Sequence, residues 1–427
     1  MTTDELRAAS AELVTLHARF SSCFGRREAR SHSLEYLRGL LSPLRRKSVE
    51  PMALGLSDAA DEEDAPVVPL QRFLTRSPWQ ASAVQEQIQA VFAEQLVPST
   101  ATWSLGTVGV LDASDFVKQG QHSVGVAPQH SGRLGKVANC QVGVFLVGVT
   151  PAGCALLDHQ LYLPKSWSRA RRLRRQTRVP PGTRFRTKPA LAAALVQRTL
   201  AAGRVHFDWL VADEDYGKDQ ALLRTLEARG QRYVFEVPST TLVWRTDPAQ
   251  EAASDAEHRG RLTAGRAAVV SVRALASQLP AASWQALQVR DGAKGPLVFQ
   301  FAAVRLWAVR RRRAGPPVWL LLRRALEEGA AIKYYLSNAD AQTPLAALAG
   351  AVCCRWRVDE WFEDSKGYLG MAHYEARSWT SWHHHMSLVA LAHLYITLVR
   401  QRLKKKRPSS PWTERSSCCR RCCRCRS

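Results

Sequence analysis

The sequence predicts a mixed α/β (α+β) fold with an N-terminal helical part, a central sheet, a mainly β insertion and C-terminal helices. Two observations carry this prediction. Apolar residues recur every three to four positions in residues 6–20 and 80–95, which is typical of amphipathic helices. From residue 105 the pattern changes to continuous or alternating apolar runs, which are typical of strands.

The first part of the chain is predicted to be helical throughout. A second helix covers residues 33–44 and is closed by Pro43, and a shorter one follows the acidic loop at 58–69 and ends before Pro78. Short helices joined by tight turns suit either a plain helical bundle or a DNA reader of the helix-turn-helix type. The sequence alone does not separate these two interpretations.

The central part begins with antiparallel strands and continues with alternating strands and helices. Residues 106–114 form a strand that carries Asp112, and residues 140–164 form two strands joined by a turn at 151–153. Further along come a helix at 188–202, a buried strand that ends in Asp213, a helix at 218–229 and a strand at 231–238. This alternation is typical of βαβ units.

Residues 238–330 contain short apolar pieces without helical periodicity and are predicted to form a mainly β insertion. A strand at 332–339 follows, and then two helices at 344–366 and 383–403. We therefore divide the chain into a helical, DNA-end-binding part, two core parts separated by the insertion, and a basic tail; their ranges are 1–98, 99–237, 238–330, 331–405 and 406–427.

The charge of the chain predicts a polyanionic partner. The 427 residues carry a formal net charge of +23, and 46% of them are hydrophobic, which excludes a mostly disordered protein and a disulfide-rich miniprotein. Residues 165–188 hold ten Lys or Arg and no acid, residues 400–427 hold eleven with one acid, and residues 310–313 are four arginines in a row. Several separate basic runs favour nucleic acid over solvated surface alone. The candidate phosphate contacts in two of these runs are Arg171, Arg172, Arg174, Arg175, Arg311 and Arg312.

The sequence also predicts a cytoplasmic protein that associates with the nucleoid when it is bound to DNA. No run of about 18 apolar residues is present, so we expect no membrane span. The N-terminus carries Asp4 and Glu5 and lacks the apolar core of a secretory signal. Five of the ten cysteines crowd the last ten residues, a pattern that suits reduced thiols better than a disulfide framework.

Two carboxylates are candidates for a metal site. Asp112 and Asp213 each come at the C-terminal end of an apolar strand, and neighbouring strand ends can bring two carboxylates together. Oxygen ligands with open water positions suit Mg²⁺ or Mn²⁺, and two such ions can activate water against a phosphodiester. For either residue taken alone, a helix-capping or turn role is the more common explanation.

A third acid is expected on the helix at 344–366. Residues three or four positions apart share a helix face, so Arg355, Asp359, Glu363 and Lys366 form one stripe, and Glu360 lies about 100° around the axis. Basic side chains beside a metal-binding carboxylate would hold phosphates. The alternative is a surface stripe of salt bridges along the helix.

Several stretches in order resemble the DDE transposases of bacterial insertion sequences, in the subgroup with a Tyr-x2-Arg-x3-Glu-x6-Lys signature. They are LDASDFVKQGQHSVGVAPQHSGRLGKVANCQVGVFL, ALLDHQLYLPKSW, WLVADEDYG, KYYLSNADAQTPL and RWRVDEWFEDSKGYLGMAHYEARSWTSWHHHMSL, from about residue 105 to 400. REARSHSLEYLRGLLSPLRRK resembles the family's leading domain.

The resemblance implies an RNase H-like catalytic core interrupted by the β insertion, two Mg²⁺ ions (for which Mn²⁺ can substitute) and cut-and-paste movement of a DNA element. The first two acids of the family fall on Asp112 and Asp213, and the signature Arg and Lys fall on Arg355 and Lys366. The signature Glu falls on Asp359, which makes the expected ligand set Asp112, Asp213 and Asp359. Glu360 and Glu363 are the alternatives for the third acid.

The chain departs from the family pattern at a few positions. Asp359 is one methylene shorter than the signature Glu, the signature Tyr falls on Val352, and Ala113 and Asp115 stand where the family motif carries an acid and a glycine. Three explanations remain: a catalytically active Asp-Asp-Asp site, a site in which Glu360 or Glu363 is the third acid, or a copy that has lost catalytic activity.

The predicted function is that of a transposase. It binds the terminal inverted repeats of double-stranded DNA, cleaves the element boundary and joins the freed end to target DNA, as a homodimer in the synaptic complex. Two alternatives remain open: an inactive DNA-binding remnant of a transposase, and an RNase H-like nuclease unconnected to transposition.

Other motifs carry weaker hypotheses. Cys419 and Cys422 have zinc-like spacing but no accompanying ligand pair, and the alternating Arg and Cys of the tail suggest a frameshift after about Pro408. An aromatic residue of the insertion could stack on an extruded base, although most tryptophans are core; the candidates are Trp244, Trp284, Trp307 and Trp319. The side chains of the histidine run at 383–385 fan out around a helix and make no convincing metal site.

Overall fold

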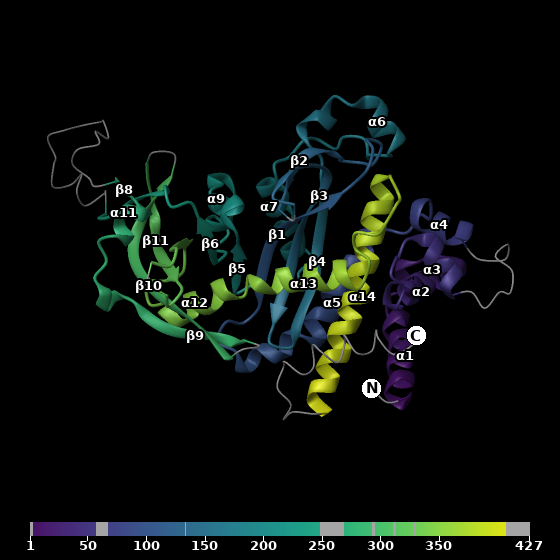
Figure 1. The fold of residues 1–427 in the computed structure, drawn as a ribbon, viewed down its shortest axis with the longest axis horizontal. Coiled ribbons are helices and arrows are strands. Elements are labelled where there is room, and N and C mark those ends of the chain that lie inside the picture. The colour runs from purple at the N-terminus through teal and green to yellow at the C-terminus, as the bar shows by residue number, and fades with distance from the viewer. Residues whose placement is uncertain are drawn as a thin grey trace. The chain divides into compact units, whose positions relative to one another are not determined.

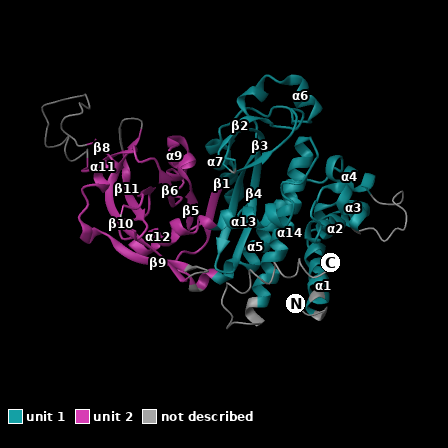
Figure 2. Ribbon diagram, viewed as in Figure 1, with its two compact units in different colours: residues 1–99, 112–206, 357–427 teal, residues 100–111, 207–356 magenta. Residues whose placement is uncertain are grey.

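The computed structural model describes residues 3–56, 67–132, 134–247, 269–292, 295–310, 313–327 and 329–406. The chain forms two compact units, each assembled from separate segments (Figure 2). Unit 1 contains residues 1–99, 112–206 and 357–427, and unit 2 contains residues 100–111 and 207–356. The basic tail from residue 407 lies outside the described residues, so the zinc and frameshift hypotheses stay predictions.

Unit 1 begins with five helices, drawn in purple and blue in Figure 1. They are α1 (Thr3–Ala18), α2 (Arg27–Leu41), α3 (Val49–Leu56), α4 (Val67–Thr75) and α5 (Ala81–Gln95). Phe24, Phe73 and Trp79 form an aromatic cluster between them, with ring centroids 5.2–6.1 Å apart. The predicted N-terminal helices are therefore confirmed, and α3 is a helix that the sequence pattern did not indicate.

The strands of unit 1 are β2 (Ala127–Ser131), β3 (Lys136–Thr150), β4 (Gly153–Tyr162) and the second half of β1 (Val108–Val117). β3 pairs antiparallel with β4 through the predicted turn, where Thr150 faces Gly153. Every residue of β3 from Cys140 to Thr150 is buried. Because successive side chains of a strand point to opposite faces, both faces of β3 are covered.

The helices α5, α7 (Lys188–Ala201) and α14 (Trp379–Lys406) of unit 1 pack on this hairpin. α7 contacts β3 and β4, and it begins where the Thr187 hydroxyl accepts a hydrogen bond from the Ala190 N–H at 3.2 Å. α14 contacts β4 as well as α2, α4 and α5 (Figure 1). The short, arginine-rich α6 (Arg171–Gln176) precedes α7 on the chain, and α13 (Trp356–Gly367) precedes α14.

Unit 2 is built on a mixed sheet. The strand order is β1, β5 (Trp209–Ala212), β6 (Tyr233–Val237), β12 (Lys333–Ser337), β11 (Arg313–Arg324), β10 (Gly295–Arg310), β7 (Leu242–Trp244) and β8 (Val269–Ser271), and β9 (Gln285–Gly292) also pairs with β10. β1, β5 and β6 are parallel, whereas the later pairs are antiparallel. The helices are α8 (Glu214–Gly217), α9 (Gln220–Glu227), α11 (Val272–Ala276) and α12 (Leu345–Cys353).

This arrangement confirms the predicted fold class: a mixed α/β, RNase H-like core with a mainly β insertion between its parts, N-terminal helices and closing C-terminal helices. The insertion has its own apolar core, in which Val243, Leu306 and Leu320 are fully buried. No disulfide joins the five cysteines that the structure describes.

One local prediction was wrong, and another was incomplete. The helix expected at 344–366 is broken at Cys354 and Arg355, which form a turn between α12 and α13, so Arg355 precedes the helix that carries Asp359. The segment predicted at 238–330 to be mainly β also contains a helix: after β8 ends, α11 begins with the Ser271 hydroxyl as its cap. A capping hydrogen bond decides the second case, because the Ala274 N–H has a side-chain acceptor at 3.2 Å.

The histidine run begins the buried part of α14. Burial lowers the pKa of His383 to about 4 and the pKa of His385 to about 3. A neutral ring satisfies both sites: His383 Nδ1 donates to the Trp379 carbonyl at 2.9 Å, and His385 Nδ1 lies 2.8 Å from the Tyr36 hydroxyl. His384 differs, because both of its ring nitrogens face carbonyls, those of Leu74 and Trp79, at 3.0 and 2.9 Å.

We expect the protein to lose stability in mild acid. The unfolded chain binds protons at His383 and His385 below about pH 6.5, whereas the folded protein binds them only near pH 4 or below. The free energy of unfolding therefore decreases as the pH is lowered from about 6.5 to about 4. Each site contributes about 1.4 kcal/mol per pH unit at most. Urea unfolding at several pH values measures this slope. His383→Gln reduces the slope, whereas His206→Gln, at an exposed position, leaves it unchanged. Equal slopes in all three proteins would contradict the assignment.

Candidate active site

β1, which carries Asp112, pairs with β5, which ends directly before Asp213. The strands are parallel, and the register pairs run from Val108 with Trp209 to Leu111 with Ala212. Asp112 and Asp213 are the residues that directly follow this last pair. The prediction that Asp213 follows the end of a strand is confirmed. The prediction was wrong for Asp112, which lies inside β1 because that strand continues to Val117.

Asp112 is a buried carboxylate at the middle of β1. Its residue is 8% exposed, and its Oδ1 accepts a hydrogen bond from the Ala113 N–H at 2.7 Å. Charged side chains are rarely this buried without a compensating group. Burial of this carboxylate therefore costs free energy that its contacts in the folded protein must offset.

Asp213 has the helix-capping role that the sequence left open. It is the N-cap of α8, and its Oδ1 accepts from the Asp215 N–H at 3.0 Å. Burial raises the pKa of Asp213, and the guanidinium of Arg355 works in the opposite direction. Capping uses one lone pair of the carboxylate, so it is compatible with a second role for the same side chain.

The acids of α13 differ in their surroundings. Asp359 and Glu363 are exposed and lie one turn apart. Glu360 is half-buried, and its Oε2 accepts from Arg357 at 3.0 Å. An ion pair with Arg357 therefore already engages the Glu360 carboxylate.

The signature lysine contacts the strand that bears Asp112. Lys366 Nζ donates to the Asp115 carbonyl at 3.1 Å and lies 5.3 Å from the centre of the Phe116 ring. Asp115 itself accepts from Ser131 Oγ at 2.7 Å, which gives this departure from the family motif a structural partner. Lys366 therefore places positive charge beside β1, three to four residues beyond the acid.

Lys118 at the end of β1 is a basic residue that sequence reasoning missed. Its Nζ donates to the Tyr374 carbonyl at 2.8 Å and lies 3.6 Å from the centre of the Tyr374 aromatic ring. Burial lowers the pKa of Lys118 to about 8, with nearby Glu375 opposing the shift. A single lysine after a strand carries no motif, so no signal in the sequence could have found it.

The predicted phosphate contacts are dispersed. Arg171, Arg172 and Arg175 are exposed on α6, whereas Arg174 donates to the Thr183 carbonyl at 2.6 Å and so supports the local loop. Arg311 and Arg312 lie outside the described residues. Val352, at the signature Tyr position, is 3% exposed within α12.

Arg310 and the tryptophans of the insertion have structural partners. Arg310 is buried and donates to Glu227 at 2.6 Å, so the first arginine of the 310–313 run neutralises an internal carboxylate. Trp244 is 4% exposed and belongs to the core of unit 2. Trp284 lies beneath the Arg324 guanidinium at 4.0 Å, and Trp319 Nε1 donates to the Asp340 carbonyl at 3.0 Å.

The acids have the chemistry that a hard divalent cation requires, because carboxylate oxygens are the ligands that Mg²⁺ and Mn²⁺ prefer. Among the described residues, no three His, Cys, Asp or Glu side chains are grouped so as to hold a metal ion. Asp112 and Asp359 belong to unit 1, and Asp213 belongs to unit 2.

Comparison with known proteins identifies the family. A sequence profile described as DDE superfamily endonuclease matches residues 19–296, a range that includes Asp112 and Asp213 and stops before Asp359. Over 208 residues the chain is 26% identical to the probable transposase for insertion sequence element IS701 of Microchaete diplosiphon. That alignment covers 48% of this chain and 48% of the relative, so the chain spans about half the length of the curated relative it matches.

In the described part of the chain, no helix has the length and apolar character that crossing a membrane requires.

The profile match covers more than half of the sequence and includes both Asp112 and Asp213. The chain therefore belongs to the DDE superfamily endonuclease family.

Proposed function

We propose that this protein is a transposase that cleaves DNA at the ends of an insertion sequence and joins the freed end to target DNA. The observation that supports the proposal is the β1–β5 register, in which Asp112 and Asp213 are the residues that follow the last pair, within the segment that matches the family. The net charge of +23 supports a DNA substrate. The likeness to an insertion-sequence transposase supports transposition over an unrelated nuclease role.

In this proposal Asp112, Asp213 and Asp359 hold two Mg²⁺ ions, for which Mn²⁺ can substitute. When bound, the metal supplies activation of water and stabilisation of the leaving oxygen at the scissile phosphate. The protein itself holds the phosphate near the acids: Lys366 beside β1 and Arg355 near Asp213 are placed to neutralise it. The N-terminal helices bind the terminal inverted repeats, and a homodimer synapses the two ends.

Asp359 is the best third acid of the three on α13. Glu360 is held by Arg357, whereas Asp359 is exposed and matches the position of the signature Glu. Its carboxylate reaches one methylene less far than a glutamate. Glu363, exposed one turn later, is the alternative that the geometry leaves available.

An inactive, DNA-binding remnant is the second candidate function. The observation that favours it is Val352, which stands at the signature Tyr position and is buried, so that position offers no hydroxyl to a phosphate. Such a protein binds the element end and does not cleave it with either metal. Cleavage without preference for the element end would instead support an unconnected nuclease.

Substitution of Asp112 or Asp213 should abolish cleavage. We expect Asp112→Asn and Asp213→Asn each to reduce cleavage of a labelled duplex carrying the element end by more than about 100-fold in Mg²⁺, because each removes a charged ligand. Asp340→Asn, the same change at an exposed ion pair with Arg232, is the matched control and should keep its activity. The assignment of Asp112 fails if Asp112→Asn cleaves as fast as the control.

The third acid can be assigned with four variants of α13. We expect Asp359→Ala to lose cleavage, and Glu363→Ala and Glu360→Ala to retain most of it. Asp359→Glu should be at least as active as the parent, because it restores the longer glutamate side chain of the family signature. Initial cleavage rates in Mg²⁺ and Mn²⁺ measure this. Loss of activity in Glu363→Ala, with Asp359→Ala still active, would move the ligand one turn along the helix.

A further inference from the structure

Unit 1 contains a basic cavity that neither the acids nor the predicted phosphate contacts occupy. It has a volume of about 560 Å³ and lies along β4, the loop at 182–186, α7 and the first residue of α14. β4 pairs with β3 alone among the described strands, so the cavity opens beside a sheet edge.

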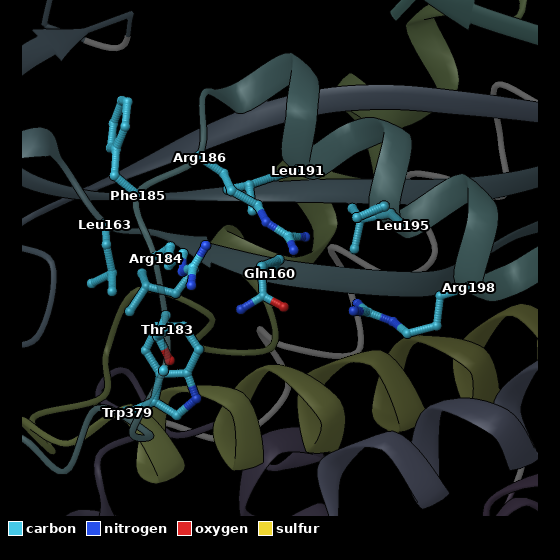
Figure 3. A pocket seen from close by; sticks show the side chains of 13 residues that line it. Gln160, Leu163, Thr183, Arg184, Phe185, Arg186, Leu191, Leu195, Arg198 and Trp379 are labelled. Atoms are coloured by element: carbon cyan, nitrogen blue, oxygen red, sulfur yellow. The ribbon is translucent and has the colours of Figure 1, made fainter. Parts of the chain in front are cut away.

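Three guanidinium groups point into this cavity. Figure 3 shows the ends of the Arg184, Arg186 and Arg198 side chains directed toward Gln160, which projects from β4. Arginine offers a planar fork of donors, and the Gln160 amide can adapt as donor or acceptor. We call these four residues the arginine cradle.

The cradle carries uncompensated positive charge. Arg198 donates from Nε and Nη2 to Asp158 at 2.8 and 2.9 Å, and Asp158 is 6% exposed, so this pair is fixed and neutral. Within the described residues, no carboxylate lies within ion-pair distance of Arg184 or Arg186, and both are exposed. A ligand of the cradle is therefore an anion that reaches it from solvent.

An aromatic wall borders the cradle. Trp379 lines the same cavity, and its half-buried indole packs against the His383 ring in a tilted arrangement, with centroids 4.5 Å apart. Its backbone N–H donates to the Thr177 carbonyl at 2.8 Å, which fixes the start of α14 against the arginine-rich segment. A flat apolar surface beside an anion site suits a base or sugar next to its phosphate.

The basic surface continues beyond the cradle. A second cavity, of about 520 Å³, shares Gln160, Arg198 and Trp379 with the first and adds Arg76 and Arg178. Arg178 has φ of +56°, which is unfavourable for a non-glycine residue, and its guanidinium donates to the Thr75 carbonyl at 3.2 Å. The two cavities together form a basic track that is longer than one phosphate group.

We propose that the arginine cradle binds a backbone phosphate of one DNA strand, with Trp379 against the adjoining nucleotide and the strand continuing past Arg178. The inference rests on the proposed function in that it takes the substrate to be DNA. It assigns positioning of DNA to Arg184, Arg186 and Arg198 rather than to the helix α6 alone. An extended track of several arginines beside one aromatic fits a polymer of phosphates better than a small carboxylate.

The test measures binding without metal, so that cleavage plays no part. The full chain is titrated with a labelled duplex carrying the element end, and with copies in which one phosphate at a time is replaced by a neutral methylphosphonate. We expect one or two neighbouring replacements to weaken binding by the parent protein. In Arg184→Gln/Arg186→Gln, affinity falls by roughly tenfold per arginine and those replacements have no further effect.

Salt dependence and a charge-matched control complete the design. The slope of log K against log salt should become shallower by about 0.9 in the double variant, because one phosphate is no longer neutralised. Arg229→Gln/Arg273→Gln removes the same charge from exposed positions of unit 2 and should keep the slope and the methylphosphonate pattern. Gln160→Glu, nearly isosteric, should weaken binding by placing a carboxylate in the cradle.

The outcomes separate this proposal from the proposed function. If the double variant binds as tightly as the control and loses affinity at the same methylphosphonate replacements as the parent, the cradle does not contact DNA, whether or not the parent cleaves in Mg²⁺. If the parent does not bind the duplex at all, the cradle is equally refuted. If the parent fails to cleave but the pattern responds to Arg184 and Arg186, the cradle stands and the catalytic proposal fails.

Discussion

The parallel pairing of β1 with β5 is the constraint on which the candidate active site depends. Four register pairs bring the two strands together, and the acids follow the last pair. The packing at this pairing is close: a Cβ at Gly109 would lie 2.6 Å from a methyl of Leu210, so a larger residue there would require the Leu210 and Phe207 side chains to move. The entry to β1 is fixed as well, because the Thr107 N–H donates to Asp208 at 2.7 Å.

Placement of the third acid depends on how α13 packs within unit 1. Trp361 and Phe362 are buried against Phe145 of β3, with ring centroids 6.0 and 5.3 Å from it. Lys366, at the far end of the helix, holds the carbonyl of Asp115. Aromatic burial on one face therefore fixes which acids stay on the exposed face, and the positive charge at the helix end lies against the strand that carries Asp112.

Much of the fold could be predicted from the sequence, and the failures have identifiable physical causes. The helix predicted at 188–202 agrees with α7, and the structure adds the Thr187 hydroxyl as the cap that fixes its start. The break between α12 and α13 was missed because neither Cys354 nor Arg355 disfavours a helix. β2 was missed because it contains a proline and polar residues, and it is a strand only through its pairing with the long β3. For the site, strand patterning indicated Asp112 and Asp213, whereas the arginine cradle assembles from β4, a loop and α7, which no spacing rule relates.

The assembly of unit 1 from three separate segments has a consequence for how the protein is made. Its last segment supplies α14, whose Trp382, Met386 and Leu391 are almost completely buried in the same unit as β4, with which the helix is in contact. A nascent chain therefore cannot complete this unit until the ribosome has passed about residue 400, whereas all residues of unit 2 have been translated by residue 356. A message truncated between those points would leave the β3–β4 hairpin without its covering helix, exposing apolar surface to proteases and aggregation. Shortened copies of such a gene are thus expected to be cleared rather than to compete for DNA.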